Sequence, residues 1–185
     1  MARRFAAATA LAVLFTCMVG GASPASAAKK KKRACAGASA IPNPTTLPRA
    51  YEAVLCLINQ ERAQRRLKAL RRSTELTQAA LDHSTDMVDR QYFAHDSLDG
   101  ETVRQRVLRT GYFSAGGGAV EEALAVGWAQ LSTPRALVAS LMRSASHASI
   151  VLSRSLRDIG IGYVLGAPQP GFDGGATLTL NVARR

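Results

Sequence analysis

Residues 159–165 read IGIGYVL and residues 176–182 read ATLTLNV, and these two stretches decide the fold class. Each alternates large apolar residues with small or polar ones, which is typical of a strand with one buried face. The apolar positions are Ile159, Ile161, Tyr163 and Leu165 in the first stretch and Ala176, Leu178, Leu180 and Val182 in the second. The intervening loop, 166–175, is rich in Gly and Pro, so we expect a long-looped hairpin.

Helical spacing dominates the chain before this hairpin. A first helix is predicted over residues 49–67, with Leu55 and Ile58 on its buried side. A second is expected to start after the cap residue Ser73 and to end near Gln91.

A third, shorter helix is predicted over 101–110, and a fourth begins at Thr133-Pro134 and runs to about Ser144. Residues 147–157 are expected to form a connection. Helices early in the chain and an antiparallel sheet late indicate an α+β fold.

Residues 1–27 have the features of a cleavable signal peptide. Arg3 and Arg4 precede an apolar run over 5–19, and the small residues ASA occupy 25–27. The alternative is a membrane anchor, but the run is shorter than the roughly 20 apolar residues that span a bilayer. We therefore expect a secreted, extracellular protein, either free or associated with the cell envelope.

The three cysteines bear on compartment and domain organisation. Cys17 lies within the signal peptide and leaves open a lipidated anchor. Cys35 and Cys56 would remain after cleavage and are expected to form a disulfide outside the cell, with two free thiols as the alternative. Residues 28–46 are basic or Pro-containing and are read as a linker, followed by one folded domain over 47–185.

Charge suggests the class of partner. The formal net charge is +11, and it falls to +9 without Arg3 and Arg4, because 22 basic and 13 acidic residues remain. The densest basic run, 29–33, would attract an anionic wall polymer or lipid, although it is equally read as a solvated tail. Nucleic acid is disfavoured, since aromatic residues make up only 5% of the chain and offer few surfaces for base stacking.

The sequence lacks the motifs of the common hydrolase and nucleotide-binding classes, so the three histidines carry most of the chemical information. His83 lies on the apolar side of the second helix and is read as a core residue. His95 and His147 are expected at junctions between an element and a loop, where functional side chains concentrate. Glu121 and Glu122 form an adjacent carboxylate pair, but spacing alone does not bring these residues together.

The order of several motifs resembles the bacterial branch of the CAP superfamily. This family, also called the SCP-like extracellular domain, includes cysteine-rich secretory proteins and plant pathogenesis-related proteins. The motifs are LINQER at 57–62, LTQAA at 76–80, DM at 86–87, YFAHDS at 92–97, DG at 99–100, EALAVG at 122–127, LMRSASH at 141–147 and DIGIGY at 158–163. Together they cover about residues 54–185.

The resemblance implies a three-layer α-β-α sandwich with a cleft that gathers histidines and acidic residues. In some members the histidines bind zinc or another divalent cation. Carried over by position, the cleft histidines are His95 and His147, and the matching glutamate is Glu122. Two imidazoles and one carboxylate would leave open positions at a tetrahedral metal.

The sequence departs from the family pattern around these residues. Ala123 stands where the family has Asn, and Leu141 stands where it has Trp. Ala145-Ser146 replaces Pro-Gly, and Ala148 and Ile150 replace Arg and Asn. Polar groups of this kind orient metal ligands, so their loss argues against a tight metal site.

Two functions remain open. The first is a non-enzymatic binding module that engages an anionic envelope component, such as wall polymer or lipid, or a secreted partner protein. The second is a metal-assisted hydrolase, with His95 and His147 as ligands and Glu122 as a ligand or general base.

Overall fold

The computed structural model describes residues 34–114, 116–172 and 174–185. The chain divides into two units, Met1–Lys31 and Lys32–Arg185, and all described residues belong to the second. The predicted signal peptide and the basic run at 29–33 therefore lie outside the described residues. The elements are α1 (Leu47–Gln64), β1 (Arg71–Arg72), α2 (Thr74–Asp89), α3 (Val103–Arg109), β2 (Ala119–Trp128), η1 (Ala129–Ser132), α4 (Pro134–Arg143), α5 (Ala145–Val151), β3 (Asp158–Leu165) and β4 (Gly175–Arg184).

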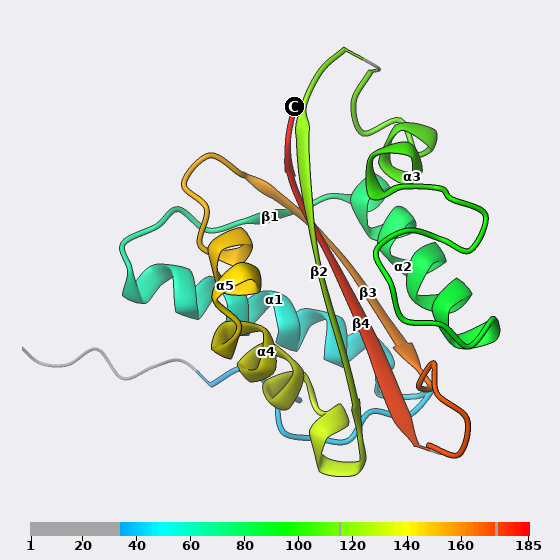
Figure 1. The fold of residues 1–185 in the computed structure, drawn as a ribbon. Coiled ribbons are helices and arrows are strands. Elements are labelled where there is room, and N and C mark those ends of the chain that lie inside the picture. Colours follow the sequence, from blue (N-terminus) through cyan, green and yellow to red (C-terminus); the bar gives the residue numbers. More distant parts are fainter. Residues whose placement is uncertain (1–33, 115, 173) are drawn as a thin grey trace, which may run out of the picture. The chain divides into compact units, whose positions relative to one another are not determined.

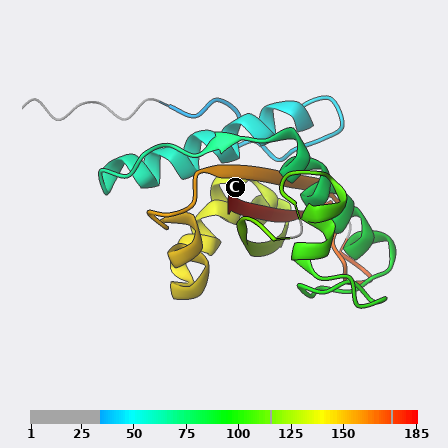
Figure 2. The same ribbon diagram turned by 90° about the horizontal axis from the view of Figure 1, so that it is seen from above.

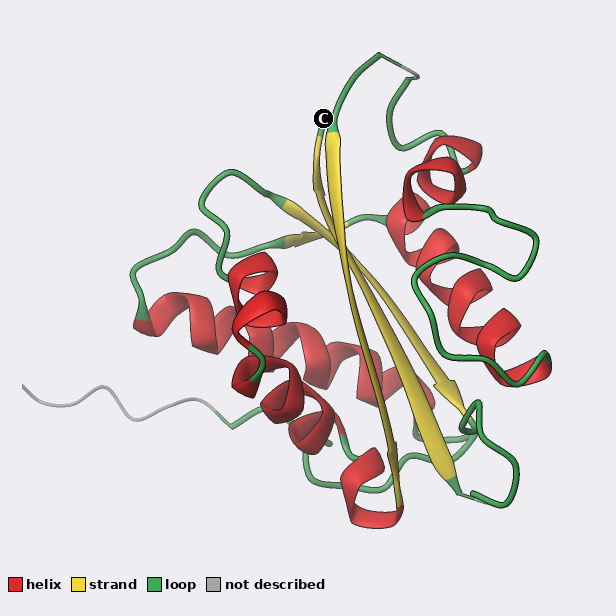
Figure 3. Cartoon of the chain, in the orientation of Figure 1, coloured by secondary structure: helices red, strands yellow, loops and turns green. Residues whose placement is uncertain are grey.

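A four-stranded sheet lies between two groups of helices (Figure 1). Helices α2 and α3 pack on one face, and α1, α4 and α5 pack on the other, as the colouring by secondary structure also shows (Figure 3). Seen from above, α1 lies beside β3, while α4 and α5 lie towards β2 (Figure 2). The predicted α+β fold and its three layers are confirmed.

The strand order is β1-β3-β4-β2. The expected hairpin is present, with β3 antiparallel to β4 and Ile161 opposite Leu180. Strand β2, which the sequence pattern did not predict, runs antiparallel along the other side of β4. The short strand β1 adds a parallel pairing to β3, in which Arg71 lies opposite Asp158.

The two faces of β3 explain the alternation in its sequence. Ile161 and Tyr163 are buried in the larger core, towards α1 and α4. On the other face, a Cβ on Gly160 or Gly162 would come within 2.1 Å of the backbone of α2, at Leu76 and Ala80 respectively. The glycines therefore allow α2 to lie directly against the sheet.

The helices largely follow the predicted caps. The Ser73 hydroxyl accepts from the backbone N–H of Leu76 at the start of α2, and Thr133 caps α4 in the same way through Ala136. One prediction is wrong: residues 147–157 are not simply a connection, because α5 begins directly after α4 at Ala145. Ser144 ends one helix and caps the next, which redirects the chain within a single residue.

Residues 34–46 form turns ahead of α1. Cys35 and Ala38 are buried in the same core as α1, and Cys35 is joined to Cys56 by a disulfide with Cα atoms 5.7 Å apart. This is the disulfide that the sequence predicted. Within the described ranges, no helix is both long and apolar enough to cross a membrane.

Candidate functional site

Glu122 is the central residue of the candidate site. It lies on β2 opposite Asn181 of β4, and its side chain is only 2% exposed, whereas the adjacent Glu121 points to solvent. Its Oε1 atom lies 3.0 Å from Nδ1 of His95, and its Oε2 atom lies 2.9 Å from Nη2 of Arg106. The carboxylate is therefore held on both sides by donors.

Arg106 neutralises this buried carboxylate, and the sequence reasoning missed it. It lies on α3, which starts with a capping box between Thr102 and Gln105. Its guanidinium also donates to the backbone carbonyls of His95 and Glu101, at 2.8 Å each. The helical spacing contained a signal, because Arg106 follows the inward-facing residue Val103 by three positions and so shares its face.

His83 is buried, as predicted, and the structure shows that it also supports the same loop. It is 1% exposed on α2, and its Nε2 atom lies 2.9 Å from the carbonyl oxygen of Ala94. A carbonyl can only accept, so Nε2 carries the proton. Burial lowers the pKa of His83, which favours the neutral ring. The same Nε2 atom is 3.8 Å from Oε1 of Glu122.

His95 is the exposed member of the cluster, in the loop after α2. Its side chain is 57% exposed, so its free ring edge is accessible to a ligand. The hydrogen bond to Glu122 raises the pKa of His95, because the carboxylate stabilises the imidazolium form. Within the loop, His83 and Arg106 donate to the backbone carbonyls of Ala94 and His95 respectively, which holds the backbone on both sides of the His95 Cα in place.

His147 lies on the third residue of α5 and not in a loop, which corrects the expectation for this residue. It is half-buried, and its backbone N–H is directed at the hydroxyl of the cap Ser144. Burial lowers the pKa of His147, and the neighbouring charge of His95 lowers it further. The two histidines are thus close enough to interact electrostatically.

The predicted metal set is only partly assembled. The structure brings His95 and Glu122 together, but across residues 34–114, 116–172 and 174–185 no group of three or more His, Cys, Asp or Glu side chains is placed to hold a metal ion. Both oxygens of Glu122 are engaged, and Nδ1 of His95 points at one of them. As placed, the carboxylate does not fit a ligand role, so metal binding by His95, Glu122 and His147 stays a prediction.

Two solved structures of bacterial proteins have a similar fold. An extracellular protein containing an SCP domain from Bacillus anthracis strain Ames is 22% identical, with a TM-score of 0.59. The match covers 78% of this chain and 45% of that protein, so the chain spans less than half of its length. An outer surface protein from Borrelia burgdorferi is 18% identical with a TM-score of 0.61, over 74% of this chain and 92% of that one.

No curated protein matches the sequence significantly. The model of the cysteine-rich secretory protein family, CAP, matches residues 55–174, which include His95, Glu122 and His147. These matched residues make up more than half of the chain, and the fold agrees with that of the two bacterial proteins. The chain therefore belongs to the cysteine-rich secretory protein (CAP) family.

Proposed function

We propose that this CAP protein is exported and acts as a non-enzymatic binding module at the cell envelope, where it engages an anionic component. The observation that carries the proposal is the state of Glu122. A general base must reach its target proton, but this carboxylate is only 2% exposed and already accepts hydrogen bonds from His95 and Arg106.

Charge supports an anionic partner. The full chain carries 24 basic and 13 acidic residues. A surplus of positive charge raises the rate at which anionic surfaces are encountered. The matched proteins from Bacillus anthracis and Borrelia burgdorferi are described as extracellular and outer surface proteins, and this supports an envelope location.

A metal-assisted hydrolase is the second candidate. The observation in its favour is that His95 and His147 lie within electrostatic reach of each other and that neither is fully buried. Two imidazole nitrogens could hold zinc or another divalent cation, which would supply an activated water. His95 would have to present the ring nitrogen that does not face Glu122.

A single experiment separates the two. The full chain and a His95→Ala/His147→Ala variant are incubated with isolated bacterial envelopes, and both bound protein and zinc content are measured. We expect equal envelope binding by the two proteins and no stoichiometric zinc in either. The opposite outcome is a wild-type protein that contains stoichiometric zinc, which the variant lacks, and that does not bind envelopes. This outcome would replace the binding module with the metal-assisted hydrolase.

A further inference from the structure

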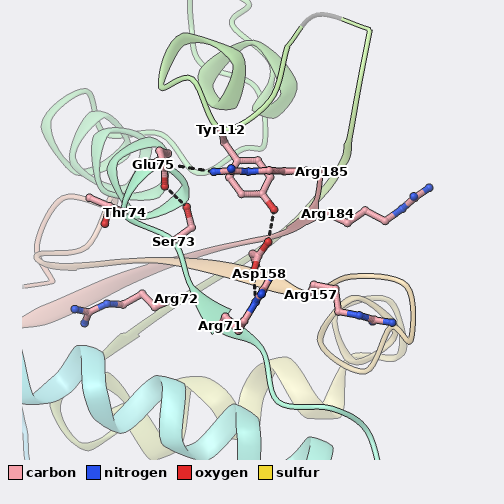
Figure 4. Close-up of a pocket in the computed structure, with 10 residues that line it drawn as sticks. All are labelled: Arg71, Arg72, Ser73, Thr74, Glu75, Tyr112, Arg157, Asp158, Arg184 and Arg185. Carbon is pink, nitrogen blue, oxygen red and sulfur yellow. Dashed lines mark hydrogen bonds and ion pairs between the residues drawn. The ribbon is translucent and has the colours of Figure 1, made fainter.

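An arginine-rich groove is lined by residues that do not include those of the candidate site (Figure 4). It has a volume of about 590 Å³ and is formed by β1, the start of α2, the start of β3 and the end of β4. We call it the arginine groove. Its lining residues are Arg71, Arg72, Ser73, Thr74, Glu75, Tyr112, Arg157, Asp158, Arg184 and Arg185.

The lining side chains carry an excess of positive charge. Five arginines and two carboxylates give a sum of +3 from side chains. Three arginines have an acidic partner: Arg71 pairs with Asp158 at 2.9 Å, Arg185 with Glu75 at 3.2 Å, and Arg72 with Glu52, outside the groove, at 2.5 Å. These pairs are too few to cancel the charge of the lining.

Two arginines of the groove have no acidic partner among the described residues. Arg157 donates only to the backbone carbonyls of Arg154 and Leu156, and Arg184 makes no side-chain hydrogen bond or ion pair with the described residues. Backbone carbonyls are neutral, so both guanidinium charges remain uncompensated. They are available to an anionic ligand.

The remaining groups hold the groove in shape. The Tyr112 hydroxyl donates to Asp158 at 2.7 Å, and the guanidinium of Arg185 lies 4.9 Å from the centre of the Tyr112 ring. The Ser73 hydroxyl donates to Glu75 at 2.5 Å. The two carboxylates are thereby fixed, and they in turn orient Arg71 and Arg185. Both arginine side chains nevertheless stay accessible, at 76% and 64% exposed.

The composition of the groove favours phosphate. Residues 34–185 contain 16 arginines and one lysine, so the positive charge of this part of the chain is almost entirely guanidinium. Guanidinium groups donate in a planar fork that matches phosphate oxygens. The N-terminus of the 16-residue helix α2 also opens on the groove at Ser73 and Thr74, and the helix dipole favours an anion there.

The spread of the arginines favours several phosphates over one. In Figure 4, Arg72 points to one side of the groove, whereas Arg157 and Arg184 point to the other. A single phosphate ion could not reach all of them, but a chain of phosphate groups could contact them in succession.

We propose that the arginine groove binds a linear polymer of phosphate groups and is the contact through which the protein holds the envelope. This inference rests on the proposed binding function and names its ligand class. The phosphate groups could belong to a wall polymer or to a layer of lipid headgroups, and we assign the polymer because the groove contains no large apolar residue apart from Tyr112 to enter a bilayer.

The test compares matched variants of the full chain. The groove variant is Arg71→Gln/Arg72→Gln/Arg184→Gln. The control, Arg49→Gln/Arg66→Gln/Arg143→Gln, removes the same charge at exposed positions outside the groove. Binding to long-chain inorganic polyphosphate is followed by fluorescence anisotropy at several salt concentrations. We expect about a tenfold or greater loss of affinity in the groove variant and a small change in the control. The slope of the logarithm of the binding constant against the logarithm of the salt concentration (the salt slope) should decrease in magnitude by about two to three in the groove variant.

A third variant tests the guanidinium fork. Arg71→Lys/Arg72→Lys/Arg184→Lys keeps the charge but removes bidentate donation, so we expect weaker binding with a nearly unchanged salt slope. Melting curves check that all variants remain folded. An equal loss in groove and control variants would overturn the proposal, since attraction would then be spread over the whole surface.

Further probes identify the source of the phosphate and separate this inference from the proposed function. Stronger groove-dependent binding to phosphatidylglycerol vesicles than to polyphosphate would overturn the polymer assignment in favour of lipid, and stronger binding to single-stranded DNA would overturn it in favour of nucleic acid. Envelope binding that survives in the groove variant would refute the groove as the contact but leave the proposed function intact. Groove-dependent polyphosphate binding without any envelope binding would refute the proposed function and the groove's role as an envelope contact, but would leave its ligand class intact.

Discussion

At the scale of single residues, the site is governed by the compensation of one buried carboxylate. Glu122 is 2% exposed, and an isolated charge at such a position would be costly. Arg106, itself 1% exposed, supplies the opposite charge, and His95 supplies a second donor. The same contacts that make the carboxylate tolerable hold it in a buried position, so Glu122 is poorly placed to act as a base on an external substrate.

The protonation of His95 provides a direct check. We expect its imidazole to titrate above the usual histidine pKa of about 6.5, because Glu122 accepts a hydrogen bond from the ring and stabilises its protonated form. Burial places the pKa of His147 below that value. The protonated form of His95 then contributes stability that is fully present below pH of about 6.5 and is lost as pH rises through its raised pKa.

Two-dimensional NMR of the histidine ring protons across the pH range measures both groups. In a Glu122→Gln variant the pKa of His95 should fall, because a neutral amide no longer stabilises the imidazolium. Melting curves of the two proteins check that the variant remains folded, because His83 also lies near Glu122 and its signals will respond to the substitution. A pKa of His95 that is the same in both proteins would contradict the assigned hydrogen bond.

At the scale of elements, the close packing of α2 on β3 positions the loop that carries His95. Gly160 and Gly162 face the helix and leave room for its backbone. Because α2 ends at Asp89, shortly before His95, the height of the helix above the sheet sets the position of the loop. The two glycines are therefore structural requirements of the site, although they lie outside it.

A Gly162→Ala substitution tests this packing. The new Cβ would lie 2.1 Å from the carbonyl oxygen of Ala80, so the helix must shift. We expect the free energy of unfolding to fall by about 1–3 kcal/mol, measured by guanidinium denaturation. Gly116→Ala is the matched control, since nothing lies within 4 Å of its added Cβ. Equal stability of the two variants would show that the helix is not held at this distance.

At the scale of the whole described unit, the disulfide joins the segment before α1 to the core. Cys35 and Cys56 are separated by 21 positions, and the buried residues Cys35 and Ala38 extend the core beyond the elements themselves. A cross-link over a loop of this length restricts the unfolded chain far more than the folded one.

Removing the disulfide should therefore destabilise the fold without changing it. For a Cys35→Ser/Cys56→Ser variant we expect a loss of about 3 kcal/mol in the free energy of unfolding, measured by denaturant titration. A reducing agent should lower the wild-type midpoint to that of the variant and leave the variant unchanged. A variant as stable as the oxidised wild type would refute the stabilising role.

The sequence by itself determined the fold class, most of the helices with their caps, the β3–β4 hairpin and the burial of His83. These features follow from local periodicity and from cap residues, which report the face and the ends of one element at a time. The resemblance to the CAP family supplied His95 and Glu122, which the structure places in contact.

Only the tertiary structure decided which distant residues meet. The sequence predictions did not include the pairing of Arg106 with Glu122. They also lacked strand β2, which carries this glutamate, and helix α5, which carries His147. The arginine groove likewise joins residues from positions as far apart as 71 and 185. The physical reason is that strand order and register, not spacing along the chain, determine which side chains lie opposite each other, and these depend on how all the layers pack together.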